Sequence, residues 1–142
     1  MSSDNITTYS FEYKVRPWTT NAERNWHHMK RAKHVKEWRE AFHWLAKNKP
    51  ALKWATITIE PWQKGGILAD VAACNPAAKA AIDGIVDAGI LKDDSPRYLH
   101  SVTFLQPQKG RDAMVVWVRG VPLTADELTG VDSATGKDDH EQ

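Results

Sequence analysis

Charged side chains surround one short stretch of the sequence, DVAACNPAAKAAIDGIVDAGILKDDSP. Lys79 and Asp83 stand four residues apart, so on a helix they share a face and can form an ion pair. Asp93 and Asp94 follow that helix, and two adjacent carboxylates repel each other unless a cation lies beside them. Asp70 precedes the helix as a third carboxylate. Carboxylate oxygens from separate segments are ligands that Mg²⁺ and Mn²⁺ prefer, and such an ion can activate water and stabilise a phosphodiester transition state.

Simpler interpretations of the same residues stay open. The Lys79–Asp83 pair is equally typical of a surface ion pair, which contributes at most about half a kcal/mol. The two aspartates before Ser95-Pro96 are also common chemistry for a turn.

The charges are distributed unevenly along the chain. Between Lys14 and Arg39, eight Lys or Arg side chains face two acids, which gives this segment a charge of +6. Residues 125–142 hold six acids and one lysine, a charge of −5. This pattern indicates a site for a polyanion near one end and a solvated or self-masking tail at the other, unless both are merely solvated surfaces.

The elements that must position these residues follow from the hydrophobic periodicity. Alternation predicts strands, and repeats of three to four residues predict helices. A long basic loop is expected between the first strand and the first helix. Asn75 is expected to cap the second helix, with Pro76 in its first turn and Gly89 at its end. The expected order is a strand at 9–15, a helix at 32–48, a strand at 53–60, a helix at 75–89 and a hairpin of strands at 97–106 and 113–120.

This order, β-α-β-α-β-β, predicts an α+β fold. A length of 142 residues predicts one domain, over residues 1–121, followed by an acidic and disordered tail over residues 122–142. No run approaches the roughly 20 apolar residues that cross a membrane. Cys74 is the only cysteine, so no intrachain disulfide can form. We therefore expect an intracellular, cytoplasmic protein with no membrane partner.

The stretch NPAAKAAIDGIVDAGILKDDSPRYL resembles the core motif of RusA-type Holliday junction resolvases. That motif contains D-x-D-N, a short gap, K-x-x-x-D-x-L and then an Asp-Asp pair. Lys79 matches its lysine, Asp83 its helical aspartate and Asp94 its catalytic aspartate of the pair. The opening YSFEYKVRPWTTNAERNW also resembles the first strand of the family and its PPSxNxxY-like residues, where Asn21 matches the asparagine.

The sequence departs from the family at the first part of the motif. The family has two aspartates shortly before its asparagine, and this chain has only Asp70. Either Asn75 is the motif asparagine, with Cys74 and Ala72 in the places of the aspartates, or Asp70 is the first aspartate, Ala72 replaces the second and a few residues are inserted. A thiolate is a poor ligand for Mg²⁺, so we interpret Cys74 as a small packed residue near the start of the helix.

The resemblance implies a homodimer, encoded by a bacterium or a phage, that binds four-way DNA junctions and other branched DNA and cuts them with Mg²⁺, which Mn²⁺ can replace. The implied catalytic residues are Asp70, Lys79 and Asp94, and the implied metal ligands are Asp70, Asp93 and Asp94. Orienting roles fall to Asp83 and Asn75. The expected DNA contacts are Asn21, Arg24, Lys30, Arg31, Lys33 and Lys36.

Two other functions remain as alternatives. The first is a DNA-binding protein that kept the fold and lost the metal site. The second is an interaction protein whose acidic tail binds a basic partner.

Overall fold

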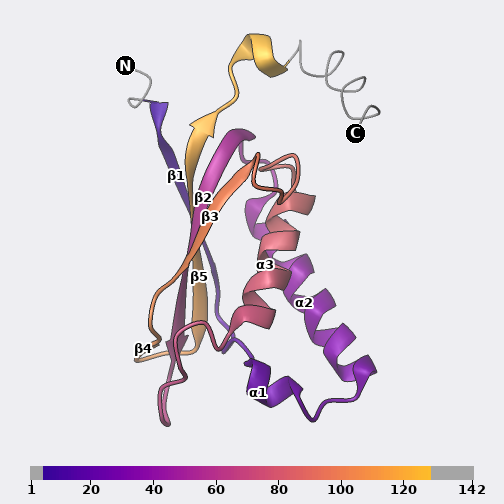
Figure 1. Ribbon diagram of the computed structural model, residues 1–142, viewed down its shortest axis with the longest axis vertical. Helices are drawn as coiled ribbons and strands as arrows, with labels where there is room; N and C mark the ends of the chain where they lie inside the picture. The colour runs from indigo at the N-terminus through magenta and orange to yellow at the C-terminus, as the bar shows by residue number, and fades with distance from the viewer. Residues whose placement is uncertain (1–4, 129–142) are drawn as a thin grey trace.

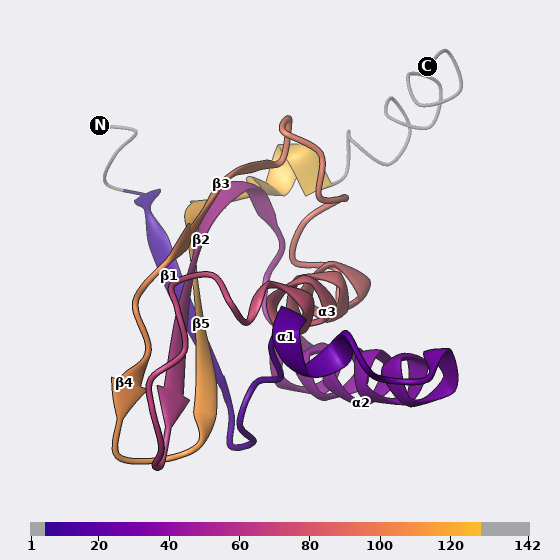
Figure 2. The same cartoon turned by 60° about the horizontal axis from the view of Figure 1, so that its bottom comes forward.

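A mixed sheet and a layer of helices over one of its faces form the molecule (Figures 1 and 2). The computed structural model describes residues 5–128. The α+β class predicted from the sequence is confirmed. In chain order the elements are β1 (Thr7–Tyr13), α1 (Thr20–Glu23), α2 (His28–Ala46), β2 (Leu52–Gln63), α3 (Asn75–Asp87), β3 (Leu99–Phe104), β4 (Gln108–Lys109) and β5 (Ala113–Pro122).

The strand order of the sheet is β1-β5-β2-β3, and the short β4 pairs with the end of β2. β5 is antiparallel to both β1 and β2, whereas β3 is parallel to β2. The predicted hairpin of the last two long strands is therefore wrong. Helix α3 carries the chain from the end of β2 back to the start of β3, and such a crossover makes the two strands parallel neighbours.

Helix α2 begins earlier than its periodicity predicts. Its buried face is made by Trp38, Phe42 and Ala46, all in the second half of the helix. The first turns, from His28 on, are basic and solvent-exposed, so they lack the apolar repeat that marks a helix. The segment predicted as a long loop therefore contains α1 and the start of α2.

Helices α2 and α3 pack against each other through a glycine. A Cβ atom added at Gly84 would lie 3.0 Å from the carbonyl carbon of Arg39 and 3.0 Å from the backbone nitrogen of His43. The buried positions of α3 around this point are mostly alanine and isoleucine. The two helices thus approach backbone to backbone, which fixes their outer faces relative to each other.

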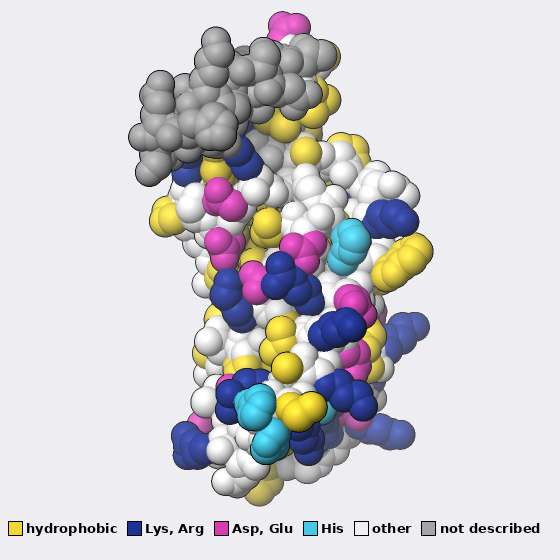
Figure 3. Space-filling model, turned by 90° about the vertical axis from the view of Figure 1, so that its right-hand side faces the viewer, with side chains coloured by type: hydrophobic (Ala, Val, Ile, Leu, Met, Phe, Trp, Pro, Cys, Tyr) yellow, Lys and Arg dark blue, Asp and Glu magenta, His cyan; other side chains and the backbone are white. Residues whose placement is uncertain are grey.

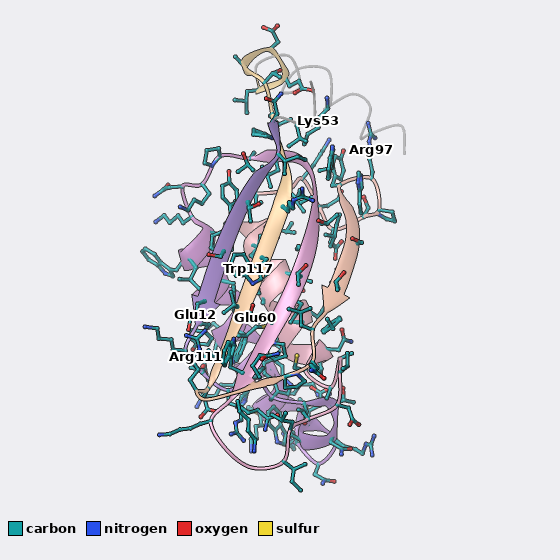
Figure 4. All side chains as sticks on the ribbon, turned by 90° about the vertical axis from the view of Figure 1, so that its left-hand side faces the viewer. Glu12, Lys53, Glu60, Arg97, Arg111 and Trp117 are labelled. Carbon is teal, nitrogen blue, oxygen red and sulfur yellow. The ribbon has the colours of Figure 1, made fainter. Side chains whose placement is uncertain are left out.

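The opposite face of the sheet carries tryptophan, threonine and charged side chains (Figure 4). The indole N–H groups of Trp62 and Trp117 both donate to the Glu60 carboxylate, at 2.6 and 2.9 Å. The Arg111 guanidinium lies 4.4 Å from the centre of the Trp62 ring and 3.1 Å from the Glu12 carboxylate. In the described part of the chain, α2 and α3 both lie on the other side (Figure 2).

The chain remains attached to the domain for several residues beyond β5. The N–H of Leu123 donates to the carbonyl of Ala51 at 3.2 Å. Thr124 and Glu127 exchange side-chain-to-backbone hydrogen bonds, as in a capping box, and Glu127 pairs with Lys53 at 2.6 Å. The first part of the predicted tail thus contacts the start of β2, and residues 129–142 lie outside the described range. Among residues 5–128, none of the helices is long and apolar enough to cross a membrane.

Candidate functional site

Lys79, Asp83 and Asp94 come together on the outer flank of α3, and we call these three residues the Lys79 cluster. The Lys79 Nζ donates to Asp83 Oδ1 at 3.0 Å and to Asp94 Oδ2 at 2.9 Å. Asp83 lies one helical turn after Lys79, while Asp94 returns from the loop that follows α3. The cluster is exposed, since 59% of the Lys79 side chain is accessible to solvent.

The charges of the cluster stabilise each other. Hydrogen bonds from Lys79 to Asp94 and then to Asp83 raise the pKa of the Lys79 ammonium. The same hydrogen bond lowers the pKa of the Asp94 carboxyl. Lys79 therefore stays protonated at neutral pH, so it can offset the charge of a phosphate group but cannot accept a proton.

A second cation, Arg39 on α2, extends the cluster along α3. Its guanidinium donates to both oxygens of Asp87, at 2.6 and 2.9 Å, and lies 4.0 Å from Asp83. These hydrogen bonds raise the pKa of Arg39 and lower that of Asp87. Neither Arg39 nor Asp87 was predicted from the sequence as a site residue. The helical spacing of Lys79, Asp83 and Asp87 marks one continuous face and is the signal that points to Asp87.

Asp93 and Asp70 lie in different surroundings from the cluster. Asp93 Oδ1 accepts the backbone N–H of Ser95 at 2.7 Å, so Asp93 closes the turn that presents Asp94. Asp70 and Asn21 line a hollow of about 470 Å³ near the N-terminus of α3. Within residues 5–128, no group donates a hydrogen bond to the Asp70 carboxylate.

The start of α3 differs by one residue from the prediction. Cys74 occupies the N-cap position without a side-chain hydrogen bond, and Asn75 is the first residue of the helix. Ala72 before it has a φ of +68°, a left-handed conformation that turns the chain into the helix. Cys74 is buried, as predicted, and burial raises the pKa of its thiol to about 11, so it is a packing residue.

The side chains present can be compared with what a magnesium ion requires. Among residues 5–128, no three His, Cys, Asp or Glu side chains form a group that could hold a metal ion. Two carboxylates lie beside Lys79, those of Asp83 and Asp94. The sequence predicts only an orienting role for Asp83. Mg²⁺ is commonly held by one or two carboxylates, with water and substrate phosphate completing its shell. Asp83 and Asp94 supply two such carboxylates, and the ion would have to use the oxygens that do not contact Lys79, because the Lys79 ammonium lies between the other two.

The expected DNA contacts gather around the first half of α2. Lysine and arginine side chains, with histidines among them, cover the lower part of the helix-bearing side (Figure 3). Trp26 and Glu23 hold two of them in place: the Lys30 Nζ lies 4.8 Å from the centre of the Trp26 ring, and Arg31 lies 3.7 Å from Glu23. We call this surface the basic face of α2. Its exposed cations are Arg24, Lys30, Arg31, Lys33 and Lys36.

The chain matches no protein-family model and no curated protein. The function must therefore be argued from the Lys79 cluster, the basic face of α2 and the motif resemblance.

Proposed function

We propose that this protein is a RusA-like endodeoxyribonuclease that binds four-way junctions or other branched DNA and hydrolyses the phosphodiester backbone with Mg²⁺ or Mn²⁺. One observation carries the proposal. Lys79, Asp83 and Asp94, which match three positions of the family motif, meet within hydrogen-bond distance although Asp94 lies 15 residues from Lys79. Motif spacing alone does not require that contact.

Lys79 is suited to bind the phosphate that is cut. Its ammonium is held at a fixed position by two carboxylates and remains exposed to an incoming strand. A positive charge placed in advance beside a phosphate stabilises the additional negative charge of the transition state. A lysine paired with two acids also costs less to bring near DNA than the bare carboxylates would, because those repel phosphate.

Asp83 and Asp94 are the residues that would hold the divalent ion. Their oxygens are the hard ligands that Mg²⁺ and Mn²⁺ accept, and the bound ion would supply Lewis-acid stabilisation of the phosphate and a more acidic water. Asp70, whose carboxylate receives no hydrogen bond within residues 5–128, lies near the start of the same helix and would be a further acidic group facing the substrate.

The basic face of α2 provides the affinity for DNA. Packed cations on an exposed helix can follow a phosphate backbone and release its counterions on binding. Since α2 packs directly on α3, this surface has a fixed position relative to the Lys79 cluster. A homodimer, as the resemblance implies, would present two such clusters to the two equivalent strands of a junction.

The test is cleavage of a synthetic four-way junction in the presence of Mg²⁺ or Mn²⁺. Asp94→Asn should abolish cleavage and preserve junction binding, because the substitution removes the carboxylate charge but keeps the shape of the side chain. Asp87→Asn is the matched control, since Asp87 is an exposed carboxylate on the same helix that pairs with Arg39 instead of Lys79. Cleavage by Asp94→Asn at the unmodified rate would contradict the assignment of the site.

A second candidate function is a branched-DNA-binding protein without nuclease activity. It is favoured by the lack of a three-donor metal group among residues 5–128 and by the hydrogen bonds that already engage Asp93 and Asp94. Tight binding of junctions with no cleavage under either metal ion would decide for this function.

A further inference from the structure

A pocket with largely apolar walls, which we call the slot, lies beside the hollow that contains Asp70. Its volume is about 420 Å³, within the range of sites that hold small ligands. Four rings line it, from the segment after β1, from β2 and from the segment before β4. These are the rings of Pro17, Trp18, Pro61 and Pro107, all of them buried.

The buried polar side chain of the slot, Gln63, forms its hydrogen bonds within the protein. Gln63 is buried, and its amide nitrogen donates to the carbonyl of Ile67 at 3.1 Å. Its oxygen accepts the N–H of Ala69 at 2.7 Å. Gln63 therefore holds the loop that forms one side of the slot, and its amide is not free to bind a ligand. The remaining polar side chains, Arg16, Thr19 and Asp70, line the slot beside its apolar rings, so a ligand with apolar faces and polar edges would fit it.

The rim of the slot is charged. The Arg16 guanidinium donates to the Asp112 carboxylate at 2.8 Å and to the carbonyl of Gly65 at 2.9 Å. These two bonds fix its plane, yet 45% of the side chain is exposed. Thr19, Ala69 and Asp70 line both the slot and the neighbouring hollow, so the two spaces adjoin. A ligand in the slot would thus meet a guanidinium at the rim.

We propose that the slot holds one unpaired nucleobase of branched DNA, with Arg16 beside the phosphate of that nucleotide. This inference rests on the proposed function and assigns the substrate's unpaired base to a defined place. A base has two apolar stacking faces and a charged phosphate on one side, which matches ring-lined walls and a cationic rim. Bases at a branch point lose a stacking neighbour, so extruding one of them costs less than in a continuous duplex.

The experiment compares two four-way junctions that differ in one residue next to the branch. One junction carries 2-aminopurine opposite an abasic analogue, which leaves an unpaired base, and the other carries the abasic analogue on both strands. Binding is measured in Ca²⁺, without cleavage, for the full chain. Stacking of one base predicts about fivefold to a hundredfold tighter binding of the first junction, with a change in 2-aminopurine fluorescence.

Two pairs of variants identify the slot as the cause. Ala22 lies on the exposed rim of the slot, so Ala22→Phe should obstruct it without unfolding the protein and reduce the affinity ratio to near one. Ala22→Ser keeps the space and should keep the ratio. Arg16→Gln should weaken binding of the junction with the unpaired base. Asp112→Asn removes the same ion pair but leaves the guanidinium, and should weaken it less.

The outcomes separate this inference from the proposed function. Equal affinity of the unmodified protein for both junctions would overturn the inference alone, as would an unchanged ratio in Ala22→Phe. Failure to bind either junction would overturn the proposed function and the inference with it.

Discussion

Substituting Gly84 with alanine tests how closely α2 and α3 pack. The added Cβ would lie 3.0 Å from two backbone atoms of α2 and closer still to the carbonyl oxygen of Arg39, whereas ordinary contacts begin near 3.4 Å. Because these are backbone atoms, the helices must separate. At an open helical position the same change would stabilise the protein by about 1 kcal/mol. Overpacking costs about 1–3 kcal/mol, and rigid backbone neighbours place this position in the upper part of that range, at about 2–3 kcal/mol. After the gain of about 1 kcal/mol is subtracted, we expect a net loss of about 1–2 kcal/mol and a fall in Tm of roughly 3–8 °C.

Urea denaturation followed by circular dichroism measures this loss. Gly65→Ala is the matched control, since its Cβ would meet nothing within 4 Å and its φ is not in the left-handed region. That variant should stay within about 0.5 kcal/mol of the unmodified protein or gain slightly. If Gly84→Ala were as stable as Gly65→Ala, the backbone-to-backbone approach of the two helices would be refuted.

Two further predictions concern salt and pH. Lys30, Arg31 and Lys33 of the basic face of α2 are replaced by alanine. The slope of log K against log salt for junction binding should then become shallower by about 0.9 for each lost phosphate contact. An unchanged slope, measured by fluorescence anisotropy, would exclude this surface as the DNA-binding site. Burial and the hydrogen bond to Glu37 raise the pKa of Tyr13 from 10.0 to about 12. Its folded pKa exceeds its unfolded one, so its contribution to stability is complete below pH 10 and is lost as the pH rises through 12. Tyr13→Phe should remove that alkaline step from a plot of Tm against pH, and persistence of the step would assign it to another group.

The Lys79 cluster shows what local spacing can predict. Lys79 and Asp83 are one turn apart on a helix that its proline and apolar repeat mark clearly, so their contact follows from the sequence. The contact of Asp94 is different. Whether Asp93 or Asp94 points toward the lysine depends on the backbone of the turn, where Asp93 bonds to Ser95. The motif resemblance, not the physical chemistry of the turn, singled out Asp94 beforehand.

The sheet shows where the sequence falls short. Alternation located the strands that became β1, β2 and β5 to within a few residues, because each has one face in the core. Alternation carries no information about which strand lies beside which. The hairpin prediction assumed that neighbours in sequence pair, and it failed because β5 pairs with β1 and β2 instead. Arg39 and Asp87 were missed for a similar reason, since their contact joins positions 48 residues apart.

The central position of β5 determines when the domain can form during synthesis. β1 and β2 lie on either side of β5 and are joined through it, yet β5 begins only at residue 113. Until the ribosome has released that strand, both partners expose unpaired backbone edges, which readily pair with other chains. Folding must wait for this distant pairing, which slows it relative to helical proteins of similar length. A chain that stops before residue 113 would therefore lack the strand that joins β1 to β2 and β3, and we expect it to aggregate or be degraded.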